Sequence, residues 1–525
     1  MGLKKESVLY HSSALAGSAI LLQGMGFVYR IIISRLAGAE GMGIFQLIMP
    51  IYAVLSALCL SGLTMAVSAK TAECRGRGDG ESCAALLGMV FRIFSGALFL
   101  CAVPVVLCSG WIARALIGQE EVRPALLLML PCLALTGIEN ILKNYFLGKA
   151  QLVPPILSEL AEQLIRIVAV TLLLLLSHPK NAAEAGCLII LGMVCSEVFS
   201  AIFLICCCRR EQKRNTSLPS CRPVLPRGLP LAGNILSVAV PVSLSGALNQ
   251  LIGSANQLFL PRGLEQSGMT AGEAVSAVGV FSGMTLPLLM LPGIFIFPLN
   301  SVLLPRISAD TAASNRSDIR RKTGKAIHVT SLLGMPSIAF LCLTGESISR
   351  MMYGSADPAE GLLPLSLGAL MSFYNAVTCA ILNGLGYAKR VSAICVAEGL
   401  IQLLCTLLGT PHWGISAYVA GFVVSSAFGG VITTVWAIQK SGVHLRGWNW
   451  FILPGLGSAV GILLSRPAYH LLLARTENDL LPVVVGGAIM LMGYGTVLRL
   501  AGMRPIRYLK GILEEKEMPV TGVAL

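Results

Sequence analysis

Apolar segments long enough to cross a lipid bilayer recur along almost the whole 525-residue chain. A membrane-spanning helix needs about 20 mainly apolar residues, because the hydrocarbon core is about 30 Å thick and each helical residue adds about 1.5 Å. Only 12% of the residues are charged, about half of the roughly 25% that is usual in soluble proteins. Little room is left for a soluble domain, and the sequence therefore predicts an all-α polytopic membrane protein.

We expect fourteen membrane-spanning helices. They fall at residues 10–36, 43–71, 84–111, 122–147, 153–177, 184–208, 231–259, 274–304, 324–345, 361–386, 390–410, 413–439, 449–472 and 480–501. The first segment follows two lysines, as a signal peptide would, but an arginine interrupts it and further spans follow. It is therefore expected to remain as the first helix.

The distribution of Lys and Arg predicts the orientation, because cytoplasmic segments carry an excess of these residues. With a cytoplasmic N-terminus, 28 of the 39 Lys and Arg fall on the inner side, eight on the outer side, and three (Arg30, Arg92 and Arg166) within the membrane. A missed span would reverse this bias from that point on. We expect a plasma-membrane protein with both termini cytoplasmic. The net charge of +13 follows from this topology and from anionic inner-leaflet lipids, so no nucleic-acid partner is expected.

An internal repeat links the two halves of the chain. The segment that begins WIARALIGQEEVRP has a counterpart that begins SISRMMYGSADPAE. Three pairs of residues carry the match: Gly118 with Gly354, Glu162 with Glu398, and Gly148 with Gly386. Six predicted helices separate the members of each pair, so both halves have the same orientation, as in transporters built from parallel repeats.

The repeat predicts two six-helix lobes and two additional helices. The lobes are residues 1–210 and 231–445, joined by a basic cytoplasmic linker at 211–230, and residues 446–525 hold the last two helices and a cytoplasmic tail. Transporters with this plan bind their cargo between the lobes and work by alternating access. Chance similarity between apolar segments is the alternative interpretation.

Ionisable residues within the spans are the first candidates for function, since each costs about 2.5–3.5 kcal/mol against lipid on insertion scales. Glu162 and Arg166 have the i, i+4 spacing of an intrahelical ion pair, which is either structural or part of a transport site. Arg92 and Lys143 lie near cytoplasmic helix ends, where extension toward the membrane surface is expected. Glu398 is the repeat partner of Glu162.

Arg30 lies well inside the first span and has no acidic residue three or four positions away. Its counter-ion must come from another helix or from a substrate, and arginine binds phosphate through two parallel hydrogen bonds. Helix 7, the repeat partner of helix 1, carries Asn249 and Asn256, followed by Arg262. This polar stripe suits a hydrated cavity that binds sugar hydroxyls.

Motifs of soluble enzymes and cofactor sites are absent from the sequence. No phosphate-binding loop, zinc-protease motif or dinucleotide fingerprint occurs, so we expect neither a catalytic activity nor a cofactor. The sixteen cysteines are scattered through apolar runs without a C-x-x-C pair, which predicts neither disulfides nor a metal site. Energy for transport must come from an ion gradient, the membrane potential or the substrate gradient.

The sequences GFVYRIIISRLAGAEGMGIFQL, YFLGKAQLVPP and AEQLIRI resemble the stage V sporulation protein B group. This group belongs to the multidrug/oligosaccharidyl-lipid/polysaccharide (MOP) exporter superfamily and is related to MurJ-type lipid II flippases. The resemblance implies two six-helix lobes around a cationic cavity and a groove for a polyprenyl tail on helices 13 and 14. It implies that the protein flips a polyprenyl-diphosphate-linked peptidoglycan precursor, for the spore cortex, from the inner to the outer leaflet.

By the same resemblance, Arg30 and Arg35 occupy positions where flippases carry cavity arginines, and Glu162 belongs to the E-Q-x-x-R-I motif. Arg35 is the weaker candidate, because it lies at the outer helix end beside Glu40. Helix 2 has no arginine between Ile44 and Ala69, unlike MurJ, which leaves another polyprenyl-linked glycan possible.

Several other functions fit the same sequence. They are a polysaccharide or O-antigen-type exporter, a cation-coupled multidrug exporter dependent on Glu162 or Glu398, and a membrane scaffold for cell-wall synthases. Membrane lipids are expected partners in every case. Cell-wall synthases are further candidate partners, above all if the protein is a scaffold.

Overall fold

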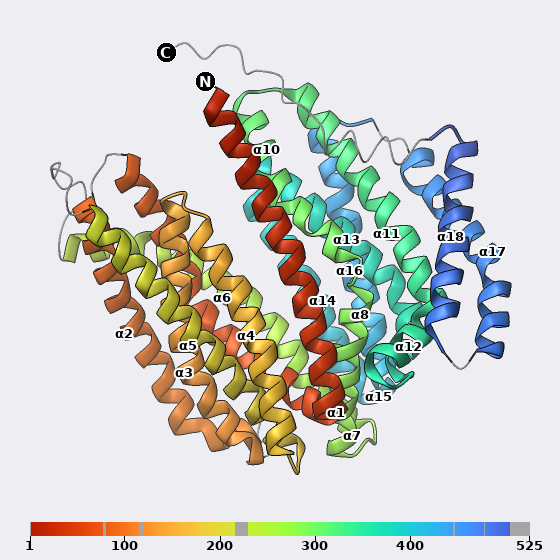
Figure 1. Ribbon diagram of the computed structural model, residues 1–525, viewed down its shortest axis with the longest axis horizontal. Helices are drawn as coiled ribbons and strands as arrows, with labels where there is room; N and C mark the ends of the chain where they lie inside the picture. The colour runs from red at the N-terminus through yellow and green to blue at the C-terminus, as the bar shows by residue number, and fades with distance from the viewer. Residues whose placement is uncertain are drawn as a thin grey trace. The chain divides into compact units, whose positions relative to one another are not determined.

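The computed structural model describes residues 2–76, 80–114, 120–215, 229–444, 447–476 and 478–503. Among these residues the secondary structure is entirely helical, which confirms the predicted fold class (Figure 1). Most of the basic linker, the C-terminal tail and Gly118 lie outside the described residues.

The helices follow one another with short connections. The α-helices are α1 (Gly2–Gly76), α2 (Gly80–Ile112), α3 (Arg123–Gly148), α4 (Val153–Ser177), α5 (Ala182–Asn215), α6 (Leu229–Gln266), α7 (Ala271–Val278), α8 (Leu286–Leu289), α9 (Gly293–Ile296), α10 (Pro298–Ala312), α11 (Arg316–Tyr353), α12 (Asp357–Glu360), α13 (Leu362–Gly384), α14 (Ala388–Leu404), α15 (Thr410–Trp413), α16 (Ile415–Ser441), α17 (Leu453–Arg475) and α18 (Leu480–Leu500). A 3-10 turn, η2 (Glu120–Val122), precedes α3, and three π-helical segments, η3 (Gly279–Thr285), η4 (Cys405–Gly409) and η5 (Trp448–Ile452), interrupt longer helices.

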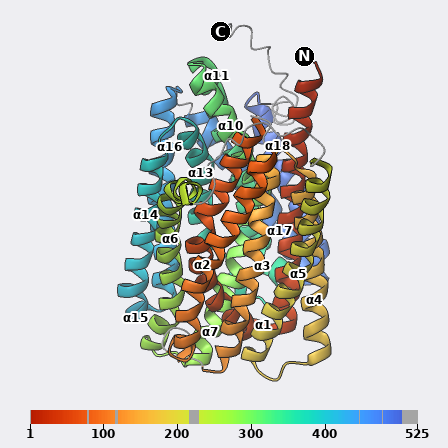
Figure 2. The same cartoon turned by 90° about the vertical axis from the view of Figure 1, so that its left-hand side faces the viewer.

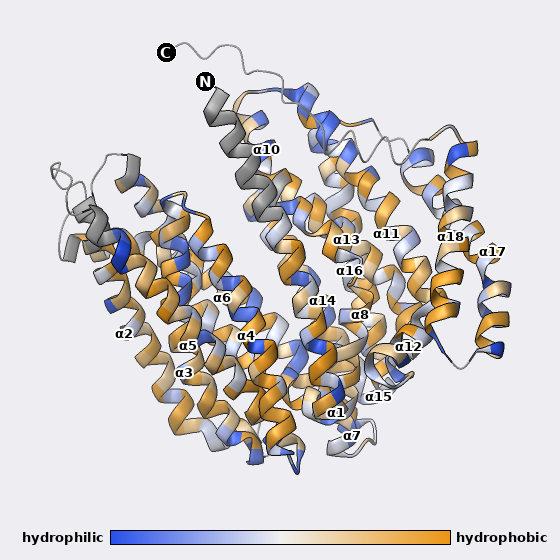
Figure 3. Ribbon diagram, viewed as in Figure 1, coloured by the Kyte–Doolittle hydropathy of each residue, from blue (hydrophilic) through white to orange (hydrophobic). Residues whose placement is uncertain are grey.

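The long helix α1 contains two membrane spans. It is interrupted at Gly38, whose φ of 70° lies in the left-handed region that glycine adopts without strain. The described residues contain 13 helices long and apolar enough to cross a membrane, and the first of these, Gly17–Cys74, covers both sides of the kink. With the kink counted as a break, the spans number fourteen, as the hydropathy of the sequence predicts. Figure 3 shows the apolar bodies of these helices.

The eighth predicted span, residues 274–304, is the least regular. It consists of α7, η3 and α8, then a turn, then α9 and the start of α10. Pro298 is the first residue of α10, where its missing N–H removes no helical hydrogen bond, whereas Pro287 directly follows the π-helical segment η3. Proline spacing therefore divides this segment into short helices.

The described chain forms two compact units. Unit 1 comprises residues 1–294 and 392–425, and unit 2 comprises 295–391 and 426–525. The lobe boundaries predicted from the repeat stay a prediction.

Glycines bring the helices of unit 1 close together. A Cβ atom on Gly62 of α1 would lie 1.9 Å from the Ala239 carbonyl oxygen of α6, and one on Gly43 would lie 2.1 Å from the Val275 carbonyl oxygen of α7. Only glycine permits such backbone contact, which is a common way to pack membrane helices. Helices α3, α4 and α5 also pack against α1 and lie side by side in Figures 1 and 2.

Unit 2 contains the last two helices, α17 and α18, packed along each other (Figure 1). The α carbon of Gly461 lies 3.2 Å from the place where a Cβ atom on Gly493 would stand. Asp479, at the start of α18, accepts hydrogen bonds from Arg350 and Ser347 of α11. The Arg350 guanidinium, more than the Ser347 hydroxyl, holds the pKa of Asp479 below its usual value. Helix α11 thus anchors the terminal hairpin.

The internal repeat is visible in the turns that follow α3 and α13. After α3, the N–H groups of residues 149, 150 and 151 donate to the carbonyls of 145, 147 and 146; 236 residues later, those of 385, 386 and 387 donate to 381, 383 and 382. Gly148 approaches Ser68 and Thr71, and Gly384 approaches Leu304 and Ile307, again 236 residues later. The predicted match of Gly148 with Gly386 is therefore wrong. Its partner is Gly384, and Gly386 corresponds to Ala150, which has the same left-handed backbone.

Candidate functional site

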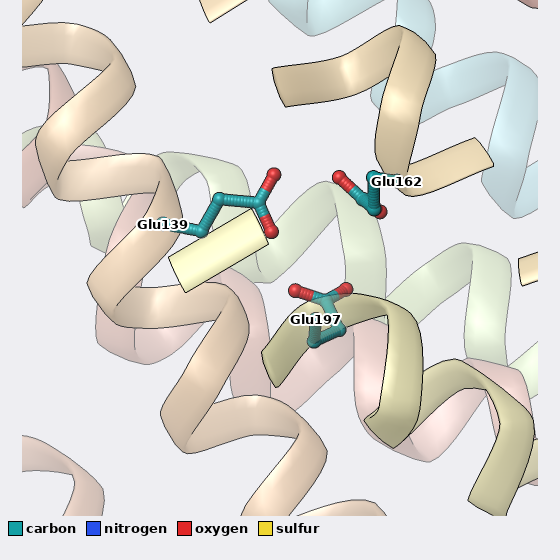
Figure 4. Close-up of side chains that lie close together, drawn as sticks. All are labelled: Glu139, Glu162 and Glu197. Atoms are coloured by element: carbon teal, nitrogen blue, oxygen red, sulfur yellow. The ribbon is translucent and has the colours of Figure 1, made fainter. Parts of the chain in front are cut away.

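A buried cluster of charged side chains lies where α3, α4 and α5 meet inside unit 1. Helix α3 contributes Glu139 and Lys143, α4 contributes Glu162 and Arg166, and α5 contributes Glu197. The first two pairs have i, i+4 spacing, which places both members on one helix face. Figure 4 shows the three carboxylates directed toward a common space, and their nearest oxygens lie within 4.8 Å of one another.

Two cations cross-link the three helices. Lys143 forms an ion pair with Glu139 on its own helix and reaches Glu162 Oε2 on α4, 3.4 Å from its Nζ. Arg166 pairs with Glu162 on its own helix, and its Nη2 lies 3.4 Å from Glu197 Oε1 on α5. Glu162 is thus shared by both cations and occupies the centre of the network.

Burial makes this cluster unusual for charged groups. Glu139 is 2% exposed and Glu197 is 4% exposed. Glu139 Oε1 pairs with the Lys143 ammonium, but Oε2 of Glu139 and Oε2 of Glu197 have no hydrogen-bond donor among the described residues. Buried charges that lack hydrogen bonds are destabilising, so an arrangement of this kind calls for a reason other than stability.

Helix α1 covers the cluster with two tyrosines. The Tyr52 hydroxyl donates to Thr136 Oγ1 at 2.8 Å, one turn before Glu139 on α3. Tyr29 is 8% exposed, and its hydroxyl has no hydrogen-bond partner in the described part of the chain. The span that carries Arg30 therefore also forms one wall of the charged cluster.

Three carboxylates so close together resemble a metal site in their spacing alone. Any metal ion at their centre would lie beside the Lys143 ammonium and the Arg166 guanidinium, and like charges repel. Both oxygens of Glu162 already face these cations. We therefore do not assign a metal centre.

Comparisons with known proteins identify the family. A family model described as "Polysaccharide biosynthesis protein" matches residues 8–309, more than half of the chain. The chain belongs to this family. Stage V sporulation protein B of Bacillus subtilis (strain 168) is 27% identical over 419 residues, which cover 77% of this chain and 79% of that protein. The uncharacterized membrane protein YabM of the same organism is 23% identical and covers 94% of this chain and 93% of its own length.

Solved structures show that this family member has the fold of MOP superfamily transporters. The lipid II flippase MurJ, in an inward closed conformation, matches with a TM-score of 0.70 and 12% identity over 93% of this chain and 99% of MurJ. An inward-facing multidrug resistance MATE family transporter of the MOP superfamily matches with a TM-score of 0.65 and 15% identity over 82% of this chain and 98% of its own. The predicted relationship is confirmed in family and fold, and the many apolar helices make this a multi-pass membrane protein.

The structure brings together some of the residues predicted from sequence. Glu162 and Arg166 form the predicted pair, but within a larger network that sequence reasoning did not assemble. The prediction that Lys143 extends to the membrane surface is wrong, because its side chain is buried and paired with Glu139 and Glu162. Two carboxylates inside the bundle attract the ammonium more strongly than the headgroup region does.

The remaining candidates lie on α1, α6 and α14 of unit 1. Asn256 is buried, donates to the Gly399 carbonyl at 3.2 Å and accepts from Thr406 at 3.1 Å, so its amide joins α6 to the segment that includes α14 and η4. Glu398, on α14, is half-buried. The side chains of Arg30, Arg35, Asn249 and Arg262 are all exposed. Contact of these residues with a substrate stays a prediction.

Glu139 and Glu197 are the members of the cluster that the sequence-based site prediction left out. Both are visible in the sequence as acidic residues within spans, and Glu139 has the same i, i+4 relation to Lys143 as Glu162 has to Arg166. Two such pairs on successive helices could have indicated a shared charged cluster from the sequence. Glu197 has no such partner on its own helix, and only the packing of α5 against α4 brings it to Arg166.

Proposed function

We propose that this protein flips a polyprenyl-diphosphate-linked glycan, a peptidoglycan precursor for the spore cortex, from the inner to the outer leaflet of the plasma membrane by alternating access. Membership in the polysaccharide biosynthesis family carries the proposal. The similarity to a sporulation protein, and a fold shared with a lipid II flippase over almost the whole chain, support it. Both termini lie in the cytoplasm in this arrangement, and no catalytic step is needed.

Arg30 is the residue most suited to contact the diphosphate. It lies between the start of the first described span at Gly17 and the kink at Gly38, and its side chain is exposed. A guanidinium exposed to lipid at this depth would cost several kcal/mol. Its exposed face therefore suits a hydrated path, where it binds a passing diphosphate through two parallel hydrogen bonds.

Other polar side chains of unit 1 extend the same chemistry. Arg262 and Asn249, on α6, are exposed and supply a second cation and an amide for sugar hydroxyls. Arg35 lies three residues before the kink in α1, and we assign it a contact at the outer end of the path. The terminal helices α17 and α18 expose many apolar side chains, such as Leu463, and offer a surface for the polyprenyl chain.

Transport in vesicles tests the role of Arg30. The protein is reconstituted with a fluorescent undecaprenyl-diphosphate-linked glycan, and exposure of the glycan on the far leaflet is followed with an enzyme that cannot cross the bilayer. We expect Arg30→Ala to slow exposure about tenfold or more, since a charge-assisted hydrogen bond is worth about 1.5–3 kcal/mol. Arg30→Lys keeps the charge but not the paired hydrogen bonds, so its rate of glycan exposure should lie between those of the wild-type protein and Arg30→Ala.

Arg92→Ala is the matched control. Arg92 is another exposed arginine within a membrane span, seven residues from the start of Ala85–Ile112, and its removal should leave transport unchanged. Full transport by Arg30→Ala, with wild-type amounts in the membrane, would contradict the role of Arg30. No transport by the wild-type protein with any polyprenyl-linked glycan would contradict the function itself.

A multidrug exporter is the second candidate, favoured by the buried carboxylates and by the MATE-like fold. In that case transport of cationic drugs should depend on Glu162 or Glu398 and be indifferent to Arg30→Ala. Drug accumulation in cells that produce each variant distinguishes the two functions. A second measurement tests whether the protein restores sporulation to a Bacillus subtilis strain that lacks stage V sporulation protein B. Restored sporulation would favour the glycan flippase, and reduced drug accumulation would favour the drug exporter.

A further inference from the structure

The charged cluster of α3, α4 and α5 does not balance its own charge. Glu139, Glu162 and Glu197 carry three negative charges when ionised, and Lys143 and Arg166 carry two positive charges. Glu159 also faces Lys143, but its side chain is 42% exposed and lies outside the buried part of the cluster. One negative charge therefore remains without compensation in the buried part of the cluster.

Like charges held so close together, away from water, do not all ionise, and one carboxyl takes up a proton. Glu162 is the least suited to hold it, since both of its oxygens face cations. Glu139 and Glu197 are suited, because each has one oxygen, Oε2, that meets neither a cation nor a hydrogen-bond donor among the described residues. A proton on either carboxyl turns an acceptor into a donor and leaves that group neutral.

The buried hydroxyl of Tyr29 points independently to a ligand at this place. It lies on α1 near Arg166 and has no hydrogen-bond partner within the described ranges. A metal ion fits this place less well than a proton does, because a hard cation such as magnesium or calcium takes about six oxygen ligands. The cluster offers two carboxylate oxygens without a partner among the described residues and one phenol, beside two cations.

The surroundings of the pair contain charged and titratable groups from every adjoining helix. They are Tyr29, Tyr52 and the exposed Arg30 on α1, Cys132 and Lys143 on α3, and Glu159, Glu162 and Arg166 on α4. None of these supplies a further buried positive charge besides Lys143 and Arg166.

We propose that Glu139 and Glu197 form a proton-binding site that holds one proton between them. Proton uptake breaks one O–H bond of a hydronium ion, which becomes water, and forms one O–H bond on a carboxylate, which becomes a neutral acid; release reverses this. The site is independent of the cargo assigned above, because it follows from the charge and packing of unit 1 alone.

Difference infrared spectroscopy of the protein in lipid vesicles tests this site directly. At pH 6 to 7 the wild-type protein should show a protonated carboxyl band that moves in heavy water and is lost in both Glu139→Gln and Glu197→Gln. By potentiometric titration, the double variant Glu139→Gln with Glu197→Gln should hold one bound proton per molecule fewer than the wild-type protein at this pH. Glu211→Gln is the matched control, since Glu211 is a largely buried, ion-paired carboxylate on the same helix as Glu197. The band should persist in it.

A second double variant, Glu139→Asn with Glu197→Thr, keeps the test valid if glutamine disturbs folding. It places in unit 1 the residues found 236 positions later, where they hydrogen-bond to each other. Absence of the band in the wild-type protein, or its persistence in both double variants, overturns the proposal. Binding of radioactive sodium to the wild-type protein, lost in the double variants, would also overturn it in favour of a metal ion. These results do not depend on glycan transport, so the two proposals fail separately.

Discussion

The buried carboxylates of unit 1 and the matching position in unit 2 show two solutions to one packing problem. Glu139 on α3 approaches Glu197 on α5. The residues 236 positions later are Asn375 on α13 and Thr433 on α16, and the Thr433 hydroxyl donates to Asn375 Oδ1 at 3.1 Å. The charged pair leaves oxygens without donors, whereas the neutral pair forms the hydrogen bond that a buried polar contact requires.

The correspondence extends one helical turn further. Lys143 pairs with Glu139 four residues before it, and Cys379 donates to Asn375 four residues before it, at 3.2 Å. A thiol and an amide stand where an ammonium and a carboxylate stand in the other half.

The difference teaches that the fold does not require the charges. Asparagine, threonine and cysteine complete the same helix contact without desolvating an ion, and buried ion pairs are often no more stabilising than neutral packing. Charge kept at this place in one half alone therefore indicates function there, and the helices around the neutral counterpart serve as an internal control.

Replacing Arg166 should have the largest effect on stability of the changes that test this comparison. In Arg166→Met, Glu162 and Glu197 remain buried without their shared cation, and breaking a buried ion pair costs about 3–5 kcal/mol. The repeat counterpart, Gln402, donates to the Tyr418 carbonyl and accepts from Ser425, both neutral groups. Gln402→Met should cost about 1–3 kcal/mol.

Unfolding in detergent micelles, followed by the melting temperature and by denaturant titration, measures both variants. A further variant, Arg166→Met with Glu162→Gln, should regain part of the loss, since it removes one of the exposed charges. Equal costs for the variants at residues 166 and 402 would break the comparison.

A smaller effect tests the alignment of the repeat. A Cβ atom on Gly148 would lie 2.6 Å from the Ser68 carbonyl oxygen, and one on Gly384 would lie 3.1 Å from the Leu304 carbonyl oxygen and 2.8 Å from Ile307 Cβ. Both alanine substitutions should lower stability by about 1–3 kcal/mol, with Gly148→Ala the more damaging. Thermal melting of the purified variants gives the order.

Gly386→Ala is the informative control for this alignment. Its added Cβ meets nothing within 4 Å, and its repeat partner is already an alanine with the same positive φ. The change should cost about 1 kcal/mol or less. A cost at Gly386 greater than at Gly384 would restore the pairing of Gly148 with Gly386.

The smallest effect concerns the neutral pair. Thr433→Val keeps the shape of the side chain but removes the hydrogen bond to Asn375, and should lower stability by about 1 kcal/mol. Glu197→Val, at the counterpart, removes one of the two carboxylates that face Arg166 and also relieves the surplus negative charge. If unit 1 is built for function, this second change should be neutral or stabilising at pH 7, by the same melting measurement.

Hydropathy and charge bias predict most of the fold, because membrane insertion depends on local segments. Fourteen spans were expected, and the described helices provide them once α1 is divided at Gly38. Hydropathy predicts the eighth span as one helix, whereas the structure divides it into α7, η3, α8, α9 and α10. The prolines in this segment are visible in the sequence, but their effect on the helix is not. Whether a membrane proline bends or ends a helix depends on the neighbouring groups that satisfy its backbone.

The site was predictable only in its local parts. The spacing of Glu162 and Arg166 predicts their pair, since residues four apart share a helix face. The position of Lys143 was predicted wrongly from its distance to the helix end, because its partner Glu162 belongs to another helix. Sequence separation gives no measure of such contacts.

The sequence by itself determined that this chain is a polytopic helical membrane protein, that its halves repeat, and that a few charges lie within its spans. These properties depend on each segment's own free energy of transfer into the bilayer. Only the tertiary structure decided that Glu139, Glu162 and Glu197 meet around two cations, and that Gly148 corresponds to Gly384. Both depend on which helix faces come together, and packing between distant segments fixes that choice.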